Sequence, residues 1–173
     1  NSFYMTSNSL LKNKNFVLFL SIRWFYSLAI QSITLTVGWQ VYILTGNPLD
    51  LGLIGLAQVL PIFLFILPSG VIADKFDRKV VITLCTIVHL LVAIYLLYYS
   101  LGDPESIWPI LAALLVHGTA RAMYQPSLNA ILPNIVEKKL FPNATAYNSS
   151  VGKLGHLLGP LASGIIIAFY DTK

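Results

Sequence analysis

A ten-residue segment, residues 70–79, carries the densest group of charges in the sequence, and a long apolar run stands on either side of it. The runs cover residues 49–71 and 80–101, and each has about the twenty residues that a helix needs to cross the hydrocarbon core of a membrane. A short charged link between two such helices must lie in water at a membrane face. Its three cations predict the cytoplasmic face.

The composition is that of a membrane protein with several spans. Hydrophobic residues make up 56% of the chain and charged residues only 10%, with a mean hydropathy of +0.73, whereas about a quarter of the residues of a soluble domain are charged. The net charge of +4 therefore does not indicate a nucleic-acid partner. The single cysteine, Cys85, lies in an apolar run, so a disulfide within the chain is excluded.

Five apolar runs predict an all-α membrane protein with five transmembrane helices. After a tail of residues 1–15, these runs cover residues 16–44, 49–71, 80–101, 107–131 and 142–170. Between the first two runs, Asn47 has the residue type that caps a helix and Pro48 the type that begins one.

The loop charges predict the orientation of the chain, because lysine and arginine favour cytoplasmic loops. On the side of the N-terminus there are seven cations, whereas the opposite side has only Lys173. The seven are Lys12, Lys14, Lys75, Arg78, Lys79, Lys138 and Lys139. We therefore expect a cytoplasmic N-terminus.

The last run contains a ridge of small residues. Gly155, Gly159 and Ser163 are four positions apart, so a helix places them on one face. Such a ridge lets another helix approach closely in lipid, and Pro160 favours a bend. Ordinary helix packing would account for the ridge equally well.

Three cations, Arg23, Arg121 and Lys153, lie inside apolar runs, in the cytoplasmic half of each predicted span. No aspartate or glutamate lies near the middle of a span to neutralise them. A cation in a low-dielectric medium needs a counter-charge or water, which predicts a water-filled, cytosol-facing cavity that attracts anionic or polyphenolic cargo. Arg23 and Lys153 could instead extend to the lipid headgroups, which leaves Arg121 as the principal candidate.

Three histidines, His89, His117 and His156, lie on the last three runs, one on each. They share no ligand spacing such as His-x-x-x-His, so we expect no metal site, and no feature indicates a cofactor. His117 is four residues before Arg121 and shares its helix face. The candidate cavity residues are Arg23, Gln31, His117, Arg121 and Tyr124.

The charged link resembles the loop signature of the major facilitator superfamily, Gly-x-x-x-Asp-(Arg/Lys)-x-Gly-(Arg/Lys)-(Arg/Lys). The matching positions are Gly70, Asp74, Lys75, Arg78 and Lys79. Asp77 stands where that family usually has glycine. An ordinary positive-inside loop with one balancing acid would also show such charges, so the short motif alone is only a hypothesis.

Later segments strengthen the resemblance. Gly155-x-x-x-Gly159-Pro160-x-x-Ser163-Gly164 is similar to the superfamily's antiporter signature, with Ser163 in place of one glycine. The segment around Arg121 matches the family's Arg-x-x-Gln-Gly pattern in part. Residues 39–53, 118–133 and 140–148 resemble the enterobactin-exporter and macrolide-efflux branch, and the resemblance covers nearly the whole chain.

The resemblance implies an incomplete six-helix N-terminal bundle, residues 16–173, whose C-terminal partner bundle is absent from this sequence. It places the protein in the inner membrane of a bacterial cell. It also implies roles in conformational gating. Gly70 would contact a helix of the missing half, Asp74 and Arg78 would form a charge relay that latches the outward-facing state, and Gly159 and Pro160 would line the seam that opens and closes between the bundles. The gating residues implied are Gly70, Asp74, Lys75, Arg78, Lys79, Gly155, Gly159 and Pro160.

The implied function is export of a small organic molecule, such as a siderophore or drug, by proton antiport through alternating access. Its partners would be the substrate, protons, the lipid bilayer and the missing bundle, and the acid that couples the protons would lie outside this sequence. A nutrient importer of the facilitator type, which should lack the Gly159-Pro160 ridge, and a five-span accessory protein remain as alternatives. An intramembrane enzyme would need a nucleophile with its base, or a metal cluster, and the sequence suggests neither.

Overall fold

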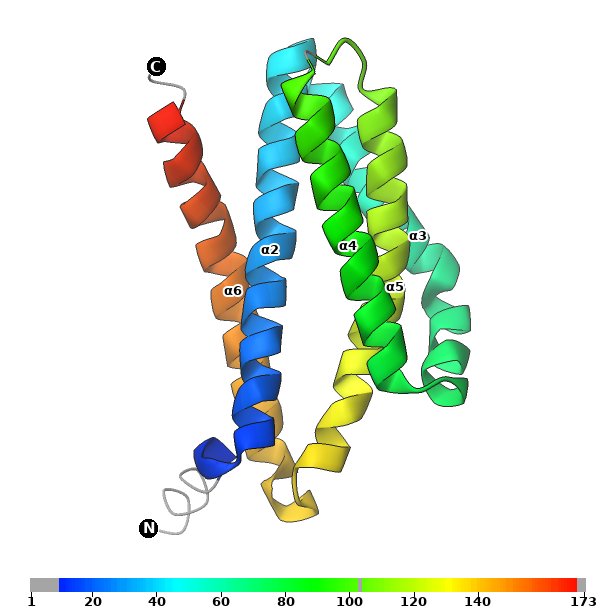
Figure 1. Ribbon diagram of the computed structural model, residues 1–173, viewed down its shortest axis with the longest axis vertical. Helices are drawn as coiled ribbons and strands as arrows, with labels where there is room; N and C mark the ends of the chain where they lie inside the picture. Colours follow the sequence, from blue (N-terminus) through cyan, green and yellow to red (C-terminus); the bar gives the residue numbers. More distant parts are fainter. Residues whose placement is uncertain (1–9, 103, 171–173) are drawn as a thin grey trace. The chain divides into compact units, whose positions relative to one another are not determined.

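A computed structural model describes residues 10–102 and 104–170, except for the side chains of residues 66, 67, 69, 71–74 and 170. Five long helices follow one another along the described chain (Figure 1). They are α2 (Lys14–Thr45), α3 (Pro48–Lys75), α4 (Arg78–Leu101), α5 (Trp108–Ile135) and α6 (Phe141–Tyr170), with the short 3-10 helix η1 (Lys138–Leu140) before α6. The predicted all-α class is confirmed.

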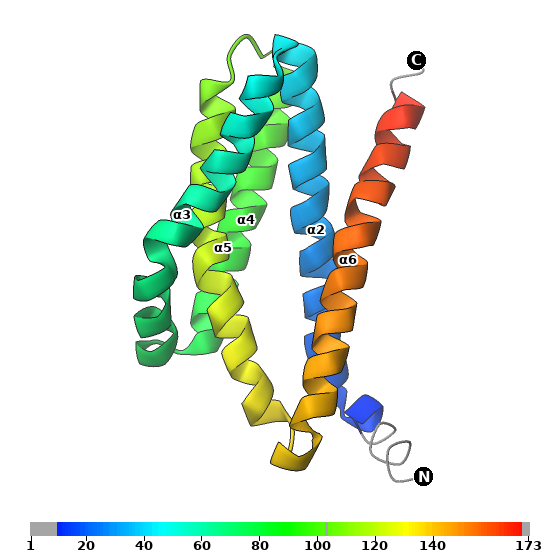
Figure 2. The ribbon, with the colours of Figure 1, turned by 180° about the vertical axis from the view of Figure 1, so that it is seen from behind.

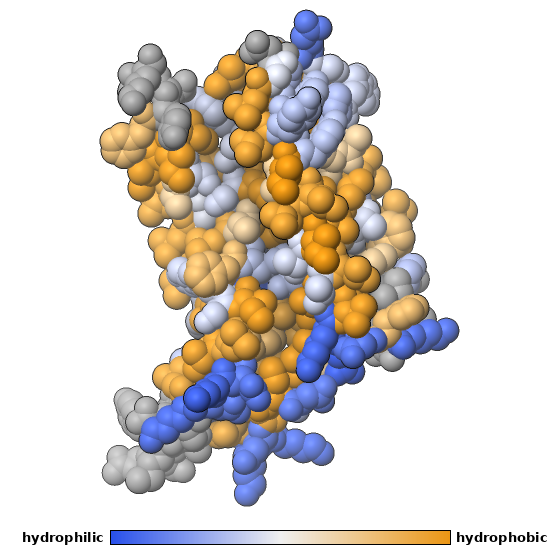
Figure 3. All heavy atoms as spheres, in the orientation of Figure 1, coloured by the Kyte–Doolittle hydropathy of each residue, from blue (hydrophilic) through white to orange (hydrophobic). Residues whose placement is uncertain are grey.

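Within the described residues, four segments are long and apolar enough to cross a membrane: Lys14–Thr45, Pro48–Phe65, Arg78–Leu101 and Lys138–Phe169. The remaining long helix, α5, has 28 residues but is less apolar, because its sequence includes His117 and Arg121. Large apolar side chains such as Phe63, 72% exposed, cover much of the surface, as Figure 3 shows for one face. Lipid is the medium that such a surface requires.

The chain divides into two units. The first contains Asn1–Thr36 with Leu132–Lys173, and the second contains Val37–Ile131. In the first unit, the N-terminal part of α2 lies beside α6 in both ribbon views (Figures 1 and 2). In the second unit, α3, α4 and α5 follow one another in alternating directions.

Short-range hydrogen bonds fix the helix starts of the second unit. Gly46 has a φ of +61°, a conformation that glycine adopts readily, and it ends α2. The side-chain oxygen of Asn47 accepts a hydrogen bond from the Leu49 backbone N–H at 3.1 Å, and Pro48 is the first residue of α3. The predicted cap and proline start are confirmed.

The departure from the family's loop pattern at Asp77 has a local explanation. Its carboxylate accepts a hydrogen bond from the Lys79 backbone N–H at 2.8 Å and caps α4. A carboxylate at a helix N-terminus also interacts favourably with the helix dipole. At this position the aspartate therefore supplies a cap that glycine lacks.

Asn13 fixes the start of α2 in the first unit. Its side-chain oxygen accepts from the backbone N–H groups of Asn15 and Phe16, and its amide donates to the Ile135 carbonyl at 3.3 Å. Phe16 is fully buried and meets the ring of Tyr147 edge-on, with ring centroids 6.3 Å apart. These contacts join the start of α2 to the end of α5 and to α6.

Candidate functional site

The ridge of small residues on α6 packs against α2. A Cβ atom added to Gly155 would lie 2.5 Å from the Ser27 Cβ, and one added to Gly159 would lie 2.8 Å from the Gln31 Cβ. The carbonyl oxygen of Leu28 is also within 2.9 Å of the second position. No side chain fits at either glycine unless the helices separate, so the close approach predicted from the ridge is present.

Ser163, which replaces a glycine of the antiporter signature, is buried and has a partner on its own helix. Its hydroxyl donates to the carbonyl of Gly159 at 3.0 Å. The Ser32 hydroxyl of α2 donates to the same carbonyl at 3.3 Å. Hydroxyl bonds of this kind satisfy a buried polar group without disturbing the helix–helix contact.

A second close crossing occurs where α5 meets α3. A Cβ added to Gly118 would lie 2.6 Å from the carbonyl oxygen of Gln58, 3.0 Å from the Pro61 ring and 3.3 Å from the carbonyl oxygen of Ala57. Pro61 has no N–H to bond the Ala57 carbonyl within α3. The glycine therefore lies against a part of α3 whose backbone is locally open.

Two histidines that the sequence did not pair lie together between α4 and α5. The Nδ1 atoms of His89 and His117 are 3.1 Å apart, and the ring centroids are 4.6 Å apart. The exposed fractions are 8% for His89 and 0% for His117. Among the described residues, the Nε2 atom of His117 is buried and has no hydrogen-bond partner.

A signal for this pair was available in the spacing. His89 is twelve residues before the end of α4, and His117 is nine residues after the start of α5. At 1.5 Å per residue, both lie roughly 14–18 Å from the loop that connects the two antiparallel helices. Similar depth on neighbouring helices, rather than spacing along one helix, indicates the contact.

Arg121 and Tyr124 belong to the same cluster. Arg121 is half-buried and lies one turn after His117 on the same helix. The ring of Tyr124, 1% exposed, lies 6.3 Å from that of His89. Neither α4 nor α5 contains an aspartate or a glutamate. Three of the five predicted cavity residues therefore gather around the histidine pair, and their cavity role stays a prediction.

The other two predicted cavity residues lie in the first unit, where both contact α6. A Cβ added to Gly152 would lie 3.1 Å from Nε of Arg23, so this guanidinium lies directly over the glycine. Gln31 packs its Cβ against Gly159. Lys153 is exposed, as expected of a side chain that extends to the headgroups.

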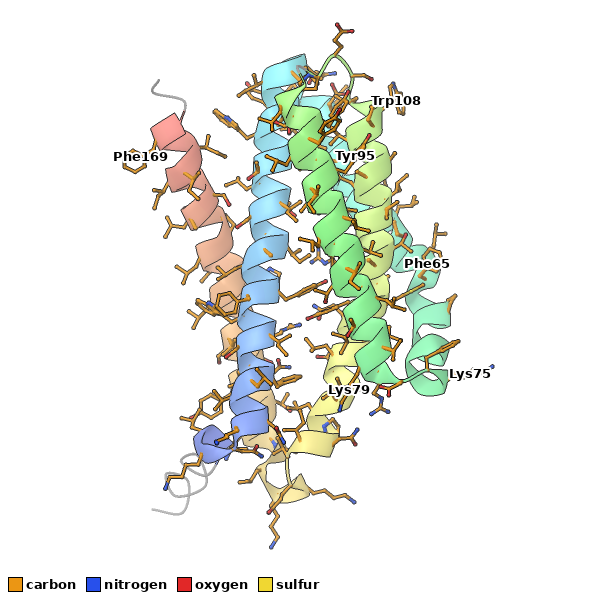
Figure 4. All side chains as sticks on the ribbon, in the orientation of Figure 1. Phe65, Lys75, Lys79, Tyr95, Trp108 and Phe169 are labelled. Atoms are coloured by element: carbon orange, nitrogen blue, oxygen red, sulfur yellow. The ribbon has the colours of Figure 1, made fainter. Side chains whose placement is uncertain are left out.

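The charged loop contributes a contact that the motif did not predict. Nη1 of Arg78 donates to the carbonyl oxygen of Ala130 on α5 at 2.6 Å. Lys75 and Lys79 are exposed (Figure 4), and a Cβ added to Gly70 would meet nothing within 4 Å among the described atoms. The side chain of Asp74 lies outside the described residues, so its relay with Arg78 stays a prediction.

The family model described as transmembrane secretion effector matches residues 8–172, nearly the whole chain. The chain belongs to this family of the major facilitator superfamily. It is thus a multi-pass membrane protein, and its apolar helices agree with that assignment.

The chain is similar to several transporters of the superfamily that have different names. The chain is 30% identical over 139 residues to a staphyloferrin A transporter of Staphylococcus aureus, covering 79% of the chain and 34% of the relative. It is 25% identical over 148 residues to the MFS-type transporter YfiS of Bacillus subtilis, covering 86% and 33%. It is 20% identical over 129 residues to a macrolide efflux protein A of Streptococcus pyogenes, covering 75% and 32%.

The chain thus spans about a third of the length of these relatives. No solved structure matches the chain.

Proposed function

We propose that this chain is the N-terminal part of a secondary active transporter that exports a small organic molecule, such as a siderophore or drug, in exchange for protons. Membership of the superfamily, with relatives named for macrolide efflux and for staphyloferrin A transport, is the observation that carries this proposal. The complete protein would lie in a bacterial inner membrane with its N-terminus in the cytoplasm. The seven-to-one division of loop cations supports that orientation.

Alternating access requires helices that change their packing during each cycle. At Gly155 and Gly159 the backbone of α6 contacts α2 with no intervening side chain on α6. Helices in contact through small residues associate by close packing rather than by interlocked long side chains. This contact lies within the N-terminal bundle, and the proposed gating role of both glycines and of Pro160, at the seam with the missing bundle, rests on the family resemblance.

Arg121 supports an anionic or hydrogen-bonding cargo. It is half-buried in α5, and neither α5 nor α4 supplies a carboxylate. An arginine inside a membrane protein is costly unless it meets water or a counter-charge. A carboxylate or phenolate on the cargo would provide that counter-charge, and bidentate hydrogen bonds would orient it.

The experiment is transport of two radiolabelled cargoes by the complete protein in inside-out bacterial vesicles: staphyloferrin A, which carries carboxylates, and erythromycin, whose amine is cationic. An exporter accumulates its cargo when the membrane is energised, whereas an importer does not. We expect Arg121→Met to abolish accumulation of the carboxylate cargo while the amount of inserted protein stays unchanged.

Lys153→Met is the matched control, because it removes the same charge from an exposed side chain. It should transport as the wild type does. Unchanged export by the Arg121→Met protein would overturn the proposed role of Arg121. Energy-independent equilibration of erythromycin, staphyloferrin A and a panel of cationic dyes by the wild type would overturn proton-driven export itself.

A further inference from the structure

The histidine pair is a buried polar group for which helix packing offers no explanation. Each imidazole is enclosed between helices, and the Nε2 atom of His117 has no hydrogen-bond partner among the described residues. A buried polar atom without a partner is destabilising. Such atoms occur where a ligand, a water molecule or a proton binds in another state.

The short Nδ1–Nδ1 distance limits the protonation states of the pair. At 3.1 Å, one Nδ1 must carry a hydrogen and donate it to the lone pair of the other. If both imidazoles were cationic, two N–H groups would face each other. The pair therefore holds at most one proton beyond its neutral state.

The unpartnered nitrogen indicates which imidazole donates. A buried N–H with no acceptor is costly, so the lone pair is the better occupant of Nε2 in His117. The hydrogen of His117 then lies on Nδ1 and is donated to Nδ1 of His89. In this arrangement Nε2 of His117 is free to bind a proton, whereas Nδ1 of His89 is already occupied as an acceptor.

We propose that the His89–His117 pair carries the exchanged proton, at Nε2 of His117, and that a hydroxyl or phenol group of the cargo competes for the same lone pair. The inference rests on the proposed function of proton-driven export. Loading forms an N–H bond at Nε2 and makes His117 an imidazolium. When the cargo donates its hydrogen bond there, that N–H bond has broken and the proton has left to water.

Exchange requires that the carrier does not hold cargo and proton at the same time. Because both would bind the same lone pair, binding of one excludes the other. Among the described residues, Arg121 lies one turn after His117 and Tyr124 lies near His89, with Cys85 one turn away on α4. From α3, the neutral Gln58 lies against Gly118, the residue that follows His117. The positive charge of Arg121 opposes a second proton and favours release of the first.

The test uses two asparagine variants of the complete protein in proteoliposomes. Asparagine places an amide near the Nδ1 position of histidine but has no atom at Nε2. His117→Asn keeps a donor to His89 and removes the proposed proton site. His156→Asn makes the same substitution at a histidine of α6 outside the pair, so it is the matched control.

We expect His117→Asn to reduce erythromycin accumulation driven by a pH gradient by about tenfold or more, the scale of a typical coupling free energy. Exchange of internal for external erythromycin, which needs no net proton movement, should continue in this variant at a higher erythromycin concentration, because the cargo also loses its acceptor at Nε2. His156→Asn should retain both activities. Loss of exchange in folded His117→Asn protein at saturating erythromycin, equal uncoupling by both variants, or wild-type accumulation by His117→Asn would each overturn the inference.

A readout without cargo separates this inference from the proposed function. In ¹⁵N-histidine solid-state NMR of the complete wild-type protein in lipid, His117 should change from the neutral Nδ1–H tautomer to imidazolium as the pH falls. His89 should remain neutral. A His117 that never becomes cationic between about pH 5 and 8, where histidines ordinarily titrate, would refute the carrier. If His117 titrates but the wild type ignores the pH gradient, proton-driven export fails and the inference fails with it.

Discussion

The two units each contain a helix crossing at a glycine, and the atoms that face the glycine differ. In the first unit, Gly155 of α6 meets a side-chain atom, the Cβ of Ser27. In the second, Gly118 of α5 meets main-chain carbonyls, the nearest being that of Gln58. A contact with a side chain can be relieved by changing the partner residue, whereas a contact with the backbone cannot. The contact at Gly155 should therefore be adjustable and the contact at Gly118 fixed.

The largest effect is expected from a bulky residue in the first crossing. Gly159→Leu would drive a branched side chain into the carbonyl of Leu28 and the Cβ of Gln31, so we expect a loss of about 3 kcal/mol or more in stability. The measurement is the fraction of monodisperse protein left after heating in detergent. Ala162→Leu, which adds the same side chain at an exposed position of α6, should change little. Equal stability of the two variants would contradict the close contact.

The sharpest comparison is a rescue experiment. Gly155→Ala and Gly118→Ala should each destabilise the protein by about 1–3 kcal/mol, because the added methyl overlaps a neighbour. Adding Ser27→Gly should restore much of the stability of Gly155→Ala, since it removes the nearest obstructing atom. The carbonyl of Trp24, at 3.2 Å, limits that rescue.

No side-chain change at Gln58 should rescue Gly118→Ala, because the obstructing atom is a backbone oxygen. The controls are Gly55→Ala on α3, where an added Cβ meets nothing within 4 Å, and Ser27→Gly alone. A double-mutant cycle in thermal stability gives the coupling energy. Rescue at both crossings, or at neither, would remove the distinction between the units.

A smaller loss of stability is expected when one hydrogen-bond donor is removed in each unit, and the loss should differ between the units. Arg78→Met removes a charged donor to the Ala130 carbonyl and should cost about 1 kcal/mol at this half-exposed site. Ser32→Ala should cost less, because the Gly159 carbonyl still accepts from Ser163. Thermal unfolding of both variants, with Lys79→Met at an exposed neighbouring position as the control, tests which variant loses more stability. A greater loss from the serine variant would reverse it.

The smallest effect is expected from Asp77→Gly, at the cap of α4. Asp77→Ala should destabilise by about 1 kcal/mol, and Asp77→Gly, which installs the residue usual in the superfamily, by only a few tenths. Hydrogen exchange of the Lys79 amide should rise in both variants. Protection unchanged from the wild type would show that the carboxylate does not cap the helix.

Sequence alone predicted the first crossing and missed the second for a physical reason. Gly155 and Gly159 are four residues apart, so the sequence of α6 alone predicts a face of small residues that another helix can approach. Gly118 stands alone, and its importance depends on its contact with Gln58 and Pro61, which are 60 and 57 residues earlier in the chain. The helix class, the cap at Asn47 and the membrane character were likewise local signals and could be predicted.

The histidine pair was missed because it depends on register between two helices. His89 and His117 meet only because the loop between α4 and α5 places them at similar depth. The cap at Asp77, in contrast, is a local feature. It was missed because the position was interpreted only as a departure from the family pattern, and not as a residue type that caps a helix. Arg121, in contrast, became a candidate from the cost of a cation in lipid alone, and its cavity role stays a prediction.

The hydrogen bond from Arg78 to a main-chain oxygen has one more consequence. The acceptor is an uncharged amide, so the bond joins α4 to α5 without pairing the guanidinium with an acid. In the proposed orientation, one side chain would help both to orient the chain during insertion and to hold two finished helices together. Glutamine at this position would preserve a donor but weaken the topogenic signal, so orientation and folding could be altered one at a time.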